Sequence, residues 1–83
     1  MTEQPENKKN EENKVPIFVN NTQYFVARGL ELVTYLKQIS GVPLADVLEQ
    51  LIEGKLEPLP DNGTVDIHGG EKFFSHPRIG SSS

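Results

Sequence analysis

The sequence predicts one small domain of the α+β class. Two β-favouring runs open the folding unit, a stretch with a helical spacing of apolar residues follows, and a β-favouring run closes it. A chain of 83 residues with 35% hydrophobic positions can enclose one core, which excludes a large enzyme with a deep cleft. Because the chain has no cysteine, it has no disulfide frame, thiolate zinc site or thiol nucleophile, and ordinary apolar packing must hold the fold.

Charge and hydropathy narrow the classes of partner. The formal net charge is -4 and the body carries no cluster of Lys or Arg, so binding to a phosphate backbone is not expected. The longest apolar runs, 17–19 and 24–27, are far shorter than the roughly 20 residues of a membrane-spanning helix or the roughly 7 to 15 of a signal peptide. We therefore expect a cytoplasmic protein that binds neither nucleic acid nor a membrane.

Composition divides the chain into three parts. Residues 1–14 have no apolar side chain after Met1 and are rich in Glu, Asn and Lys, which predicts a disordered N-terminal tail. Residues 15–79 contain the apolar runs and are the predicted folded domain. Residues 80–83, one glycine and three serines, are the predicted flexible C-terminal tail.

The first half of the domain predicts a hairpin and a helix. Residues 16–19 and 24–27 favour β-structure, and the turn-favouring residues 20–23 join them. From Glu31 the apolar positions are spaced by three and four, which predicts a helix of about ten residues that ends at Gly41. The apolar positions of this helix are Leu32, Tyr35, Leu36 and Ile39.

Turns and short extended segments fill the end of the domain. Residues 60–63 predict a turn and residues 65–67 a short segment, and Gly69-Gly70 predicts another turn. Residues 72–76 then predict a final strand that runs out through Pro77.

The middle of the chain allows two interpretations. Its apolar residues match a helical stripe, which predicts a second helix. A hairpin, one helix and a final strand need a further strand if a single sheet is to cover the apolar faces, which predicts a strand in the same place. The residues concerned are Leu44, Val47, Leu48, Leu51 and Ile52.

The order of these elements resembles a ubiquitin-type β-grasp. The resemblance lies in the hairpin within 17–26, the helix ending near Ile39, Gly41-Val42-Pro43, Leu51-Ile52 followed by Gly54-Lys55, and a terminal strand leading to a glycine. The closing stretch 70–78, Gly-Glu-Lys-Phe-Phe-Ser-His-Pro-Arg, is similar to the ending of bacterial multiubiquitin-type domains and of the modifiers of bacterial ubiquitination-like operons. The likeness covers nearly all of residues 15–80.

This resemblance implies a mixed sheet of four to five strands wrapped on one helix, with residues 47–52 as the third strand. The expected core is Ile17, Val19, Val26, Leu32, Leu36, Ile39, Leu51, Leu59 and one of Phe73 and Phe74. Phe18 and Ile52 are expected to face outward in a patch that, with His76, contacts partners. The alternative is that Phe18 and Ile52 are scattered surface hydrophobes, which are common on proteins and require no partner.

The resemblance also implies chemistry at the C-terminus. In this family the carboxylate of the terminal glycine becomes an acyl adenylate, then an ester or thioester on an enzyme, and finally an amide on a target amine. Gly80 is the matching glycine, reached through Arg78 and Ile79. Ser81 and the serines after it would have to be removed by a peptidase, or be a foreign appendage. The alternative is that Gly80 is only the first residue of a flexible C-terminal tail.

The resulting expectation is a non-enzymatic ubiquitin-like modifier, monomeric when free, that needs no cofactor. Its implied partners are an activating enzyme, a conjugating enzyme and a processing metallopeptidase, in a bacterial pathway of the kind used in antiphage defence. Two alternatives stay open: a non-covalent interaction module of the same fold, and a sulfur carrier with a terminal thiocarboxylate.

The remaining polar residues predict no second site. His68 and His76 are the only imidazoles, and no third ligand converges on them, so no metal site is expected. Asp66 and His68 can share a face of an extended segment, and we expect a surface pair rather than a catalytic dyad. Three lysines of the domain are expected on the surface, where they aid solubility or accept a modifier: Lys37, Lys55 and Lys72.

Overall fold

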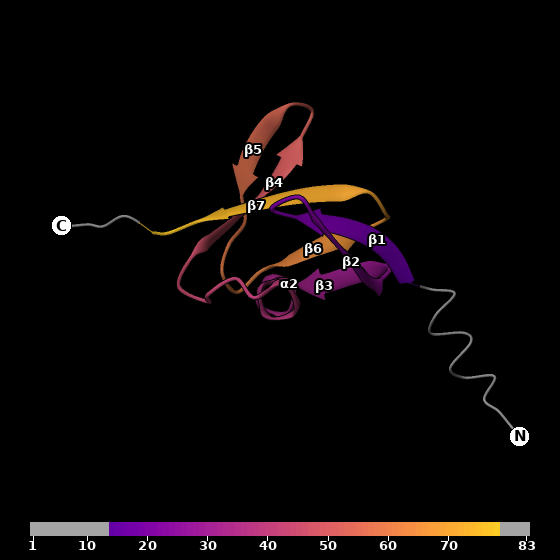
Figure 1. Cartoon of the computed structure of the whole chain (residues 1–83), viewed down its shortest axis with the longest axis horizontal. Helices are drawn as coiled ribbons and strands as arrows, with labels where there is room; N and C mark the ends of the chain where they lie inside the picture. Colours follow the sequence, from indigo (N-terminus) through magenta and orange to yellow (C-terminus); the bar gives the residue numbers. More distant parts are fainter. Residues whose placement is uncertain (1–13, 79–83) are drawn as a thin grey trace, which may run out of the picture.

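A computed structural model describes residues 14–78, which form a five-stranded sheet, a two-stranded sheet and one helix (Figure 1). The elements in chain order are β1 (Lys14–Val19), β2 (Thr22–Ala27), β3 (Gly29–Leu32), α2 (Val33–Ser40), β4 (Val47–Ile52), β5 (Lys55–Pro58), β6 (Thr64–Ile67) and β7 (Glu71–His76). The predictions for the two tails, including those for Ile79, Gly80 and Ser81, fall on residues outside the described range.

The larger sheet is mixed, with the strand order β2-β1-β7-β4-β5. Its central pair, β1 and β7, is parallel, and its other pairs are antiparallel. The helix packs on one face, so the chain has a β-grasp-like α+β fold, and the predicted fold class is confirmed. Residues 47–52 form strand β4 between β7 and β5, so the strand interpretation of the middle segment is correct. Pairing on both sides outweighs its helical periodicity.

The first hairpin turns more tightly than its sequence predicts. Asn20 and Asn21 have φ angles of 52° and 71°, so these two residues alone connect the strands. Asparagine tolerates this left-handed conformation, and two-residue turns of this kind match the twist of the flanking strands. At the far end Lys14 pairs with Ala27, which corrects the predicted tail by one residue because Lys14 belongs to β1.

The helix begins two residues later than predicted. Residues 29–32 form a strand instead, because they pair antiparallel with β6 from Gly29–Ile67 to Leu32–Thr64. Leu32 is therefore 54% exposed rather than in the core. The predicted end of the helix is confirmed. Gly41 has a φ of 75° and its N–H donates to Gln38 O, which forms a left-handed cap that glycine adopts without strain.

The core lies between the helix and the larger sheet. Of the residues expected there, Ile39 and Leu59 are only partly buried, and Leu51 lies on the opposite sheet face from Leu48, which takes its place. Phe73 rather than Phe74 points inward. The buried apolar residues are Val15, Ile17, Val19, Val26, Val33, Leu36, Val42, Leu48, Val65, Ile67 and Phe73.

Candidate functional site

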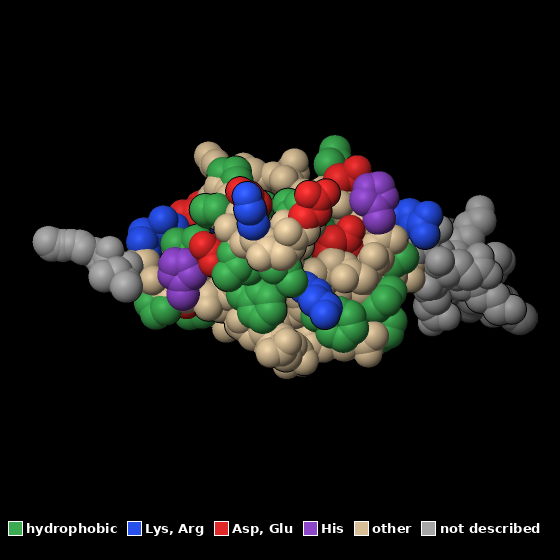
Figure 2. All heavy atoms as spheres, turned by 90° about the horizontal axis from the view of Figure 1, so that it is seen from above, with side chains coloured by type: hydrophobic (Ala, Val, Ile, Leu, Met, Phe, Trp, Pro, Cys, Tyr) green, Lys and Arg blue, Asp and Glu red, His purple; other side chains and the backbone are tan. Residues whose placement is uncertain are grey.

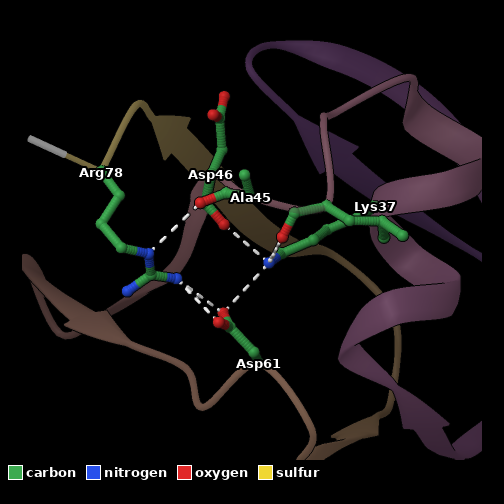
Figure 3. Close-up of polar contacts among 6 residues, drawn as sticks. Lys37, Ala45, Asp46, Asp61 and Arg78 are labelled. Atoms are coloured by element: carbon green, nitrogen blue, oxygen red, sulfur yellow. Dashed lines mark hydrogen bonds and ion pairs between the residues drawn. The ribbon is translucent and has the colours of Figure 1, made fainter.

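The end of β7 is the part of the structure closest in sequence to the predicted reactive glycine. Arg78 follows β7 after Pro77, and its guanidinium group holds a distant part of the chain (Figure 3). Arg78 Nη2 donates to both carboxylate oxygens of Asp61, at 2.9 and 2.8 Å, and Nε donates to the Ala45 carbonyl at 3.3 Å. These contacts tie Arg78 to the turn at Asp61 and to the loop at Ala45.

Lys37 lies behind this ion pair and is completely buried. Its Nζ donates to the carbonyls of Leu44 and Asp46, at 3.0 and 2.6 Å, and to Asp61 Oδ1 at 3.1 Å. A buried ammonium group is costly unless its donors are satisfied, and these three acceptors match its three N–H groups. The prediction of a surface lysine is therefore wrong for Lys37, which in this fold cannot accept a modifier.

Asp61 links the two cations. It sits in the predicted turn of residues 60–63, which is closed by a hydrogen bond from Gly63 N–H to Pro60 O of 3.0 Å. The hydrogen bond from Lys37, assisted by the charges of Lys37 and Arg78, lowers the pKa of Asp61 below its ordinary value. We call these three residues the Lys37–Asp61–Arg78 cluster. It joins the helix, the loop before β4, the turn before β6 and the chain after β7.

The sequence analysis missed this cluster. The pairs Lys37–Asp61 and Asp61–Arg78 are separated by 24 and 17 residues, so no local pattern reports them. One signal was present: Lys37 is four residues after Val33 and directly follows Leu36, which places it on the buried side of the helix. The predicted apolar face of the helix began at Leu32 instead of Val33, and this face did not include Lys37.

The face of the larger sheet turned away from the helix is partly apolar. Phe18 lies opposite Lys72 on β7, and Phe74 lies opposite Glu49 on β4, so these residues share one face. Leu51 is on the same face and lies opposite Leu56 on β5. We call this set the apolar outer face: Phe18, Leu51, Leu56 and Phe74. Figure 2 shows several patches of hydrophobic side chains on one face of the molecule, with charged side chains between them.

The predicted partner-binding residues are not all together. Phe18 is on the apolar outer face and half-buried. Ile52 is 44% exposed, but alternation along β4 places it on the opposite face from Leu51. A single outward patch containing both Phe18 and Ile52 is therefore wrong.

His76 lies at the end of β7, on the same face as Phe74. Its Nδ1 donates to the Pro77 carbonyl at 3.0 Å, and its Nε2 is 3.4 Å from Glu49 Oε2. The hydrogen bond to Pro77, helped by Glu49, raises the pKa of His76 above its ordinary value. His76 is thus a half-exposed group between the apolar outer face and Arg78.

The predicted surface pair of Asp66 and His68 is confirmed, with 3.2 Å between Asp66 Oδ2 and His68 Nε2 and both side chains largely exposed. Within residues 14–78, no group of three or more His, Asp or Glu side chains is placed to hold a metal ion. The helix in this range is too short and too polar to cross a membrane. A scan against models of protein families, a search of curated proteins and a search of solved structures each returned no match.

Proposed function

We propose that the protein is a ubiquitin-like modifier whose reactive group is the carboxylate of Gly80. The observation that supports this most directly is the position of Arg78. β7 is paired on both sides, with β1 and β4, and Arg78 at its end is held by Asp61 and Ala45. Gly80 follows two residues later in the sequence. A rigid body would thus present a short arm from a fixed point.

The protein would supply the acyl group and its enzymes the catalysis. The Gly80 carboxylate attacks the α-phosphorus of ATP and releases pyrophosphate, which leaves an acyl adenylate. A thiol or hydroxyl of the enzyme then displaces AMP, and a target amine displaces the enzyme to form an amide. Glycine suits this arm because it has no Cβ and can adopt many backbone angles in a narrow active site.

Three partners follow from this proposal. A processing metallopeptidase removes residues 81–83, an activating enzyme forms the adenylate, and a conjugating enzyme passes the acyl group on. The pathway belongs in a bacterial cytoplasm, where ATP is present, and the protein itself needs no cofactor.

The test is to incubate the chain ending at Gly80 with ATP and an activating enzyme of a bacterial ubiquitination-like pathway. We expect a covalent adduct that requires ATP and is visible by intact mass. The chain that keeps residues 81–83, and a Gly80→Val variant of the trimmed chain, are the controls and should form none. Absence of an adduct with the trimmed chain would contradict the proposal.

A non-covalent interaction module is the second candidate, and the apolar outer face favours it. Such a module would keep its function when Gly80 is replaced by valine and lose it when Phe18 is replaced by aspartate. A modifier would lose its function with the Gly80 variant. A sulfur carrier would be recognised by an intact mass in which sulfur replaces one oxygen of the terminal carboxylate.

A further inference from the structure

The two edges of the larger sheet differ in how they are protected. β5 forms one edge and carries Lys55, Glu57 and Pro58 in four residues. Charged residues and proline on an edge strand discourage pairing with another chain. β2 forms the other edge, and its six residues, Thr-Gln-Tyr-Phe-Val-Ala, include neither a charge nor a proline. The β2 edge therefore lacks the protection that the β5 edge has.

Hydrogen bonds of β1 show which main-chain groups of β2 have no partner within residues 14–78. Pro16 O accepts the Gly70 N–H at 2.7 Å, so Pro16 directs its main-chain groups toward β7, and its neighbours Val15 and Ile17 direct theirs toward β2. Val26 and Tyr24, their partners, are thus bonded to β1. The alternating residues of β2 direct N–H and C=O groups away from the sheet, and all three are exposed: Gln23, Phe25 and Ala27.

We propose that β2 pairs antiparallel with β2 of a second copy of this chain, about a two-fold axis at Phe25. In this register Phe25 lies opposite Phe25 of the second copy, and Gln23 lies opposite Ala27. Each pair exchanges both of its N–H···O bonds, because these residues direct both groups outward. The two sheets become one continuous sheet across the dimer.

The side chains of β2 fit a second copy. Phe25 is 59% exposed and lies opposite Pro16, on the same sheet face as Phe18. Its pairing with its own copy brings two aromatic rings together across the strands, which is a favourable cross-strand contact.

The charges near this edge do not oppose the pairing of two copies. The basic residues near this edge, Lys14 and Arg28, both lie at its Ala27 end. The two-fold axis places that end beside the uncharged Thr22 and Gln23 of the other copy, so no like charges meet. Because only one strand of each copy takes part, the buried area is below the roughly 1,200 Å² of a standard interface, and the dimer should be weak. On this proposal the chain is a monomer when dilute and a dimer at high concentration.

Sedimentation equilibrium between about 10 μM and about 1 mM tests the proposal, since weak dimers populate this range. We expect the wild-type chain to shift from monomer to dimer across it. Phe25→Lys should remain monomeric throughout because two lysines would face each other. Leu56→Lys, a matched change on the protected β5 edge where Leu56 is 47% exposed, should dimerise as the wild type does.

Amide hydrogen exchange supplies a second measurement on the wild-type chain. The N–H groups of Gln23, Phe25 and Ala27 should become protected as concentration rises, whereas that of Leu56 should not. A wild-type chain that is monomeric at about 1 mM would overturn the proposal. A dimer that survives Phe25→Lys, or that leaves these three amides unprotected, would overturn it as well.

Discussion

Each end of β7 is held by its own charged side chain, Glu71 at the start and Arg78 after the end. The two side chains bind partners at very different distances along the sequence. At its start, the Glu71 carboxylate accepts hydrogen bonds from the N–H groups of His68 and Gly69, at 2.6 and 2.8 Å, which are three and two residues away. At its end, Arg78 binds Asp61 and Ala45, which are 17 and 33 residues away. The first constraint can form within a short peptide, whereas the second exists only when the whole fold is in place. The arm proposed to carry the reactive carboxylate thus depends on global folding.

Removing the buried ammonium group of Lys37 should disrupt the long-range contacts at the end of β7. We expect this change to have the largest effect on stability. Lys37→Ala leaves a cavity and deprives the Leu44 and Asp46 carbonyls of their donor, so we expect a loss of about 3–5 kcal/mol in the free energy of unfolding. Urea denaturation measures it. Lys37→Met keeps most of the volume and should cost less. An alanine variant that unfolds like the wild type would contradict this role.

A second variant should release Arg78 while the buried Lys37 stays in place. It tests whether Asp61 holds the chain at the end of β7. Asp61→Asn removes the carboxylate that both cations share, so Arg78 is freed and trypsin should cleave the bond after it several-fold faster. The cleavage is followed by mass spectrometry of the released C-terminal fragment. Glu57→Gln, an exposed acid on β5, is the control and should leave this rate unchanged. Equal rates in all three chains would show that Asp61 does not hold Arg78.

A change at the local end should have a smaller and separate effect. Glu71→Gln leaves one acceptor oxygen for two N–H donors, so one hydrogen bond is lost and the other loses its charge assistance, and we expect a loss of about 1–2 kcal/mol in stability. The amides of His68 and Gly69 should exchange faster with solvent. Tryptic cleavage after Arg78 should not change, and a faster cleavage would show that the two ends are coupled.

The smallest effect concerns pH. Since the pKa of His76 is raised in the folded state, its contribution to stability is complete below the ordinary histidine pKa and is lost as pH rises through the raised value. The contribution of Asp61 to stability has the opposite pH dependence. It is present above the ordinary carboxyl pKa and is lost as pH falls through the lowered pKa of Asp61. An NMR titration of His76 should give a lower pKa in Glu49→Gln. An unchanged value would show that Glu49 is not a cause.

The contrast between contacts that are near and far in sequence also explains what could be predicted from the sequence. The turn at Gly69-Gly70 was predicted, because φ angles of 120° and 87° there require glycine, and glycine pairs are visible in a sequence. Strand β4 was predicted only through a resemblance, since its own periodicity also fits a helix. The Lys37–Asp61–Arg78 cluster was not predicted, because it depends on where three distant segments meet.

The position of the core strands was easier to predict than that of the helix. Ile17, Val19 and Val26 are buried as expected, because alternation fixes the faces of a hairpin once its strands are found. The helix was shifted because Leu32 fits the helical spacing and gives no sign that it pairs with β6. Its pairing with Thr64 is 32 residues away in sequence and is a property of the assembled fold.

The parallel pairing of β1 with β7 has a practical consequence. Because both strands run in the same direction, the start of β1 and the end of β7 lie at opposite ends of the sheet (Figure 1). A fluorophore attached to the side chain of Lys14 would be remote from any enzyme that contacts Arg78.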